Sequence, residues 1–144
     1  MMKLAPVLAL LIWSCGDTAE VNTLEGSVNR LYDLAFDTVR ARKTATELAV
    51  QYVSGRSVPV QVVVDLAASE LTGPGQYDLT GQSTVVGSVN RQELPAFVNG
   101  SVTFSALGLT NGSAVAGHFE ANVETDTATY AVRGTFETTL ELFE

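Results

Sequence analysis

Cysteine and histidine are almost absent from this chain of 144 residues, which has one of each, Cys15 and His118. A single cysteine cannot form an intramolecular disulfide, and a single histidine cannot supply a histidine-rich metal site or a conventional zinc finger. Cys15 also has no histidine near it in the sequence, which argues against a catalytic thiol.

Basic residues are scarce as well. Eight Lys and Arg stand against 16 Asp and Glu, so the formal net charge is −8. A nucleic-acid-binding surface needs clustered cations to neutralise phosphates, so we expect no nucleic-acid partner. The one basic cluster, residues 40–43 (RARK), could contact a phosphate or an acidic partner. Charges beside a turn more often serve only to keep the surface solvated.

Several catalytic and metal-binding motifs are missing. No Gly-x-Ser-x-Gly elbow marks a hydrolase nucleophile, and no spacing of Asp and Gly matches an EF-hand. Residues 73–75 (GPG) lack the lysine of a phosphate-binding loop and do not open a helix. The sequence therefore predicts no cofactor and no metal.

The apolar run at residues 4–13 is too short for a membrane-spanning helix, which needs about 20 residues. Lys3 precedes this run and the small Ser14 follows it, as in a signal peptide. We therefore predict a signal peptide at residues 1–14, a polar tether at 15–22 that begins with Cys15, and one β domain at 23–144.

Residues Ile12-Trp13-Ser14-Cys15 resemble the lipobox of bacterial lipoproteins: an aliphatic residue at −3, a small residue at −1, then cysteine. Trp13 is bulkier than the residue usual at −2. The resemblance implies that the Cys15 thiol is lipidated and becomes the mature amino terminus, with several acyl chains as a firm membrane anchor. Gly16, in place of Asp, favours the outer membrane over the inner. An ordinary secretory signal with an incidental cysteine is the alternative.

The sequence that follows the predicted signal peptide and tether has mostly the patterns of β-strands. In residues 57–66 (SVPVQVVVDL), four valines and Leu66 alternate onto one face, the period-2 pattern of a half-buried strand. Pro59 cannot donate to a ladder and suggests an edge or a strand start.

Two later stretches, 115–124 (VAGHFEANVE) and 132–141 (VRGTFETTLE), carry Val, Gly, Phe and Glu at the same places. Their alternation predicts an antiparallel hairpin with Phe119 and Phe136 buried and His118 exposed. Each glycine would leave room beside a ring or allow the sheet to bend.

Residues 27–54 fit two periods. The segments 27–36 (SVNRLYDLAF) and 45–55 (ATELAVQYVSG) match both strand alternation and helical spacing, and their Thr, Val and Tyr favour strands. Asn99-Gly100 and Asn111-Gly112 are predicted turns. Together the segments predict an all-β fold: a single antiparallel β-sandwich or small barrel of about seven strands. An α+β fold is the alternative if residues 27–54 are helical.

Few side chains could perform chemistry. His118 and Glu120 would share the outward face of one strand, where they could bind a metal or move a proton. Asp65, Asp78 and Glu124 could add carboxylates, although solvated strand residues are the simpler interpretation. Six aromatic residues fall on inward faces, where they form a core or line an apolar pocket: Tyr32, Phe36, Tyr52, Phe104, Phe119 and Phe136.

Residues 57–143, with phrases such as GQYDL and NGSVTFSAL, resemble the β-rich lipoproteins of bacterial envelopes. We therefore expect a lipid-anchored, non-catalytic envelope protein that binds or assembles with an unknown protein or envelope partner. A small barrel that carries an apolar ligand is the first alternative. A hydrolase that uses His118 with carboxylates is the second.

Overall fold

Alternation of apolar and polar residues continues through most of residues 21–143, the part of the chain that the computed structural model describes. The elements in chain order are β1 (Thr23–Glu25), the 3-10 helix η1 (Ser27–Arg30), β2 (Thr38–Lys43), β3 (Glu47–Ser54), β4 (Ser57–Asp65), α2 (Leu66–Ser69), β5 (Gly75–Asp78), β6 (Thr84–Val89), β7 (Gln92–Glu93), β8 (Ala96–Leu107), β9 (Ala114–Glu124) and β10 (Thr129–Leu142). The expected all-β class is confirmed.

The ten strands form one sheet in the order β5-β8-β9-β10-β2-β3-β4-β6-β7, and β1 pairs with β10. Every pair is antiparallel except β10 and β2, which run parallel from Leu140 opposite Ala41 to Leu142 opposite Lys43. The path ends at β5 and β7, so the sheet does not close. The expected count of about seven strands is too low, because pieces as short as β1 and β7 carry too little alternation to be recognised.

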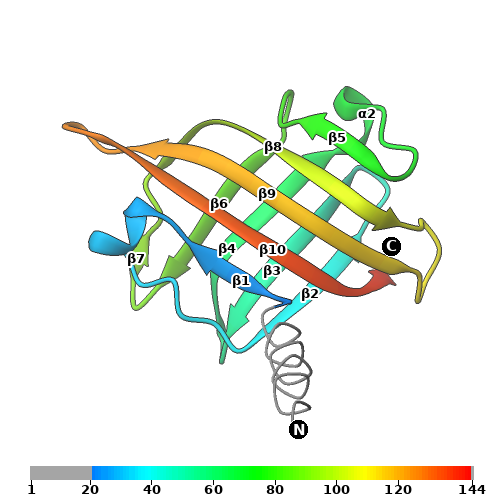
Figure 1. Ribbon diagram of the computed structural model, residues 1–144, viewed down its shortest axis with the longest axis horizontal. Helices are drawn as coiled ribbons and strands as arrows, with labels where there is room; N and C mark the ends of the chain where they lie inside the picture. The colour runs from blue at the N-terminus through cyan, green and yellow to red at the C-terminus, as the bar shows by residue number, and fades with distance from the viewer. Residues whose placement is uncertain (1–20, 144) are drawn as a thin grey trace, which may run out of the picture.

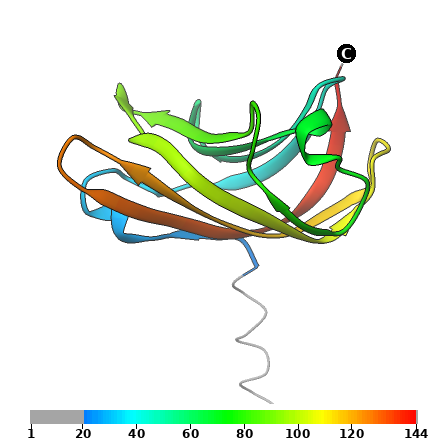
Figure 2. The same ribbon diagram turned by 90° about the horizontal axis from the view of Figure 1, so that it is seen from above.

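The sheet folds over itself into two layers (Figures 1 and 2). The front layer contains β1, β5, β8, β9 and β10, and the back layer contains β2, β3, β4, β6 and β7. Strands of the two layers cross in Figure 1, and the core lies between the layers. β10 connects the layers, because most of its length pairs with β9 and its last three residues pair with β2.

The predicted hairpin is confirmed in β9 and β10. Phe119 and Phe136 are 1% and 2% exposed, whereas His118 is exposed. The register places Gly117 opposite Phe136 and Phe119 opposite Gly134. The repeated phrase therefore pairs with itself, so that the glycine of each copy lies across from the ring of the other.

Gly134 leaves space that other side chains use. A Cβ at this position would lie 2.8 Å from the Tyr52 hydroxyl and 3.0 Å from the ring of Phe119. The expectation that glycine makes room beside a large ring therefore holds at Gly134.

β4 is confirmed as a strand, and Val60, Val62 and Val64 are fully buried. Pro59 does not lie on an edge strand, because β4 runs between β3 and β6. The β4–β6 register shifts between Val58 and Gln61, and this irregularity accommodates a residue without an N–H. The Pro59 carbonyl accepts a hydrogen bond of 2.7 Å from the Tyr32 hydroxyl.

Two local expectations are wrong. Residues 27–36 are not a strand, because Ser27–Arg30 form η1 and residues 31–36 are irregular. The later part of the ambiguous region forms strands β2 and β3.

Asn99-Gly100 is not a turn but lies inside β8, beside a register shift. A Cβ at Gly100 would lie 2.5 Å from the Glu120 carbonyl oxygen, so this glycine permits close strand contact. Asn111-Gly112 forms the predicted turn.

Candidate functional site

The outer face of the front layer gathers most of the candidate side chains. His118, Glu120 and Glu124 all project outward from β9. The register continues these positions across neighbouring strands: Thr103, His118 and Thr135 form one row, and Ser101, Glu120 and Arg133 form the next. The result is a polar surface that spans several strands.

A hollow of about 520 Å³ opens on this face. Its polar lining combines carboxylates, amides, hydroxyls and one guanidinium: Asp78, Thr80, Asn99, Ser101, Glu120, Asn122 and Arg133. The Asn122 amide donates a hydrogen bond of 2.8 Å to Asn99 Oδ1, which orients both side chains. This lining offers both donors and acceptors to a polar ligand.

His118 lies beside a smaller hollow of about 210 Å³ that Glu120, Arg133 and Thr135 also line. Within residues 21–143, no hydrogen bond joins its imidazole to another side chain. A hydrolase needs its histidine within reach of a carboxylate and a nucleophile, and these contacts are not made here. The same described residues contain no group of three His, Cys, Asp or Glu side chains arranged to hold a metal ion.

Asp65 has a structural role. Its carboxylate accepts backbone N–H bonds from Gln82 at 2.9 Å, Ala67 at 3.1 Å and Ala68 at 3.2 Å. These bonds, led by that from Gln82, lower the pKa of the Asp65 carboxyl. Asp65 therefore caps α2 and ties it to the segment before β6.

The remaining carboxylates are only partly brought together. Asp78 and Glu120 line the same hollow of the front layer. Glu124 is the last residue of β9, and Asp65 ends β4 in the back layer. The four candidate carboxylates therefore do not form one cluster.

All six aromatic residues belong to the core cluster or pack against it, and all but Tyr32 make ring contacts with one another. Ring centres are 5.1 Å apart for Phe36 and Tyr52, 6.0 Å for Tyr52 and Phe119, and 5.7 Å for Phe104 and Phe136. The hollows on the described surface lie around this aromatic core. An apolar carrier would need an internal cavity among these rings.

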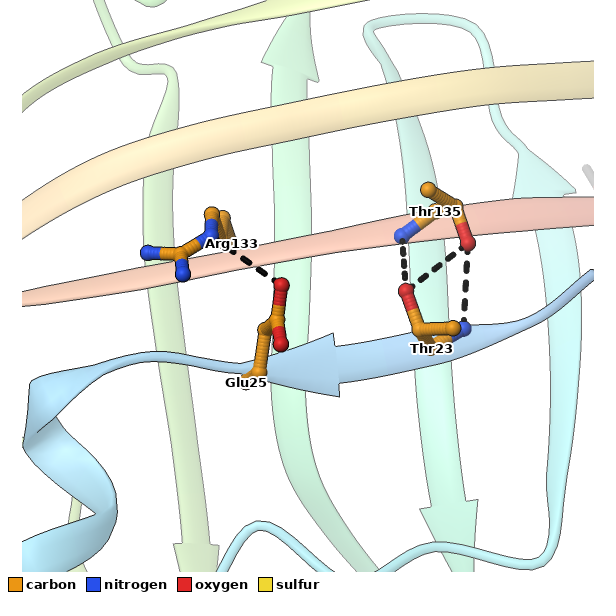
Figure 3. A network of polar contacts seen from close by, with 4 residues as sticks. All are labelled: Thr23, Glu25, Arg133 and Thr135. Atoms are coloured by element: carbon orange, nitrogen blue, oxygen red, sulfur yellow. Dashed lines mark hydrogen bonds and ion pairs between the residues drawn. The ribbon is translucent and has the colours of Figure 1, made fainter. Parts of the chain in front are cut away.

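β1 holds the N-terminal end of the described chain on the front layer (Figure 3). The backbone N–H of Thr23 donates to the Thr135 hydroxyl at 3.1 Å, and that of Thr135 donates to the Thr23 hydroxyl at 3.3 Å. Glu25 and Arg133 form an ion pair of 3.1 Å. The Thr135 hydroxyl also donates to the Val21 carbonyl at 2.7 Å, so the chain enters the domain beside β10.

Cys15 and the predicted signal peptide lie outside the described residues, as does most of the predicted tether. Within residues 21–143, no helix has the length and apolar character needed to cross a bilayer.

Comparison with known proteins finds no family model, no curated protein and no solved structure that matches the chain.

Proposed function

We propose that this protein is a lipid-anchored, non-catalytic binding module of the bacterial cell envelope. The observation that carries the proposal is the lipobox-like tetrad, which ends at Cys15 and lies a few residues before β1 begins at Thr23. An extended chain between these two residues reaches about 27 Å. The front layer would therefore stay close to the membrane surface, and Gly16 favours the outer membrane.

The polar hollow of the front layer supports a binding role. Except for Thr80, which follows β5, its donors and acceptors come from β5, β8, β9 and β10, so a ligand would contact mainly the sheet. His118 without a hydrogen-bonded carboxylate favours binding over catalysis.

Metabolic labelling with a fatty-acid analogue tests the anchor. We expect label on the wild type and none on Cys15→Ala, because the thiol and the new amino terminus both belong to Cys15. Ser14→Gly is the matched control, since it keeps a small residue at −1 and should still be labelled. Equal label on wild type and Cys15→Ala would refute the anchor.

A photo-crosslinking amino acid tests the binding role in the native envelope. At position Ser101 or Asn122, inside the front hollow, it should give a discrete adduct. At Arg56, in the turn between β3 and β4, it should not give that adduct. The same adduct from both places, or none from the hollow, would count against a binding site in the front layer.

A further inference from the structure

The outer face of the back layer carries a second groove, which crosses β2, β3 and β4 and has a volume of about 310 Å³. Its lining includes Arg42, Glu47, Ala49, Gln51, Gln61 and Phe143. This volume is at the lower end of the range of about 300–1,000 Å³ that is usual for small-molecule sites.

Two of the side chains that line the groove are apolar, Ala49 and Phe143. Ala49 is only 7% exposed, so it lies below its longer neighbours in the lining. Phe143 is 41% exposed and adds an open aromatic surface. This lining suits a ligand with a flat C–H face.

Two glutamine side chains of this lining are held in place. Arg40 Nε donates to Gln51 Oε1 at 2.6 Å, and Gln51 Nε2 in turn donates to Gln61 Oε1. Gln51 is only 9% exposed, so this chain of bonds fixes a nearly buried amide. The Gln61 amide nitrogen has no partner within residues 21–143 and offers its N–H groups to the groove.

The walls carry opposite charges and an aromatic ring. Arg42 Cζ lies 3.8 Å from the centre of the Phe143 ring, a cation–π contact that orients the guanidinium. Glu47 supplies a carboxylate to the same groove. Neither Arg42 nor Glu47 forms an ion pair with another residue of the described range, so both keep hydrogen-bonding capacity for a ligand.

We propose that this groove binds a short stretch of a neutral polysaccharide. Sugar hydroxyls both donate and accept, so they can bond to Glu47, to Arg42 and to the Gln61 amide, while the C–H face of the ring packs on Ala49 and Phe143. An anionic ligand would meet the Glu47 carboxylate, and an apolar ligand would leave Arg42 and Gln61 without partners. The proposal is independent of the lipid anchor.

Co-sedimentation with cellulose, chitin and amylose particles tests the proposal, using the full chain purified in detergent. We expect the wild type to bind at least one of these particles. Gln61→Ala and Arg42→Ala should weaken that binding about tenfold or more, the loss expected when a bonded sugar hydroxyl loses its partner. Ala49→Leu should also weaken it, because the added side chain fills the groove and removes no polar group.

Arg56→Ala is the matched control, since it removes an exposed arginine from the turn between β3 and β4 and leaves the groove intact. Thermal unfolding of each variant should show that the domain is folded. Binding to polyglutamate-coated particles, measured for the wild type and for Glu47→Gln, distinguishes a site for neutral ligands from a site for anions. The proposal is overturned if no neutral particle binds the wild type, or if the groove variants and Arg56→Ala bind equally. It is also overturned if only polyglutamate binds and Glu47→Gln strengthens that binding.

Discussion

Among single residues, Tyr52 connects the two layers directly. It belongs to β3 in the back layer and is fully buried. Its hydroxyl donates a hydrogen bond of 2.7 Å to the Thr135 carbonyl on β10 in the front layer. Burial raises the pKa of this hydroxyl far above its ordinary value, because the charged phenolate would lose its hydration.

Tyr52→Phe should lower the free energy of unfolding at neutral pH by about 1–3 kcal/mol, because the partly buried Thr135 carbonyl loses its partner. Denaturant titration measures this change. Tyr130→Phe is the control, since this half-buried tyrosine makes no hydrogen bond through its hydroxyl to another described residue. A loss as large in the control as in Tyr52→Phe would contradict the assigned role.

The same tyrosine predicts a pH dependence. Its folded pKa lies above the unfolded value of about 10, so its contribution is complete below pH 10 and is lost as the pH rises further. Burial, with help from Asp33, also raises the pKa of Tyr32 to about 12. Stability should therefore fall above pH 10, and Tyr52→Phe should make that slope shallower by about 1.4 kcal/mol per pH unit. An unchanged slope would show that Tyr52 ionises equally in both states.

At the scale of elements, β1 is a short strand that side-chain hydrogen bonds help to hold against β10. It has three residues, and its contacts combine backbone pairing with the hydroxyl bonds of Thr23 and Thr135. The Glu25–Arg133 pair is more than half exposed on both sides, and such pairs contribute little in water. The two threonines therefore hold β1 more firmly than the ion pair does.

Thr135→Val should loosen β1, because the substitution removes the hydroxyl that bonds to Thr23 and to Val21. Hydrogen exchange at the backbone amides of residues 23–25 should become faster, and the free energy of unfolding should fall by about 1 kcal/mol. Arg133→Ala should change both quantities much less. Faster exchange in Arg133→Ala than in Thr135→Val would reverse this ranking.

Strands with a long run of alternating apolar and polar residues could be predicted from the sequence. Elements whose conformation depends on contacts with distant segments of the chain could not. The faces of β4, β9 and β10 follow from local periodicity, which also correctly places His118 and Glu120 on the outer surface. Residues 27–36 alternate by chance, and their conformation is set by packing of η1 against β10. The groove of the back layer could not be predicted, because Phe143 reaches Arg42 only through the pairing of β10 with β2.

At the scale of the whole molecule, the last residues of β10 join the layers. Leu140 is 1% exposed and lies opposite Ala41 at the start of the parallel pair. Leu142 is in the same strand and pairs with Lys43, but it is 45% exposed. The same substitution at both leucines therefore tests the packing at the junction, because only one of the two side chains is buried.

Leu140→Ala should lower the free energy of unfolding by about 2–5 kcal/mol, because the side chain leaves a cavity where the layers meet. Leu142→Ala should change it by less than about 0.5 kcal/mol, since its side chain is largely in water. Denaturant unfolding curves of the two variants give the comparison. Equal losses would show that the junction does not depend on the packing of Leu140.

The position of β10 also determines when the domain can fold during synthesis. β1 and β2 are made before the other described strands, but both pair with β10, which is made after them all. Contacts between such distant segments form slowly, because long loops must close first. Until β10 has been made, β1 has no strand to pair with and β2 has only β3, so the two layers cannot be joined before then.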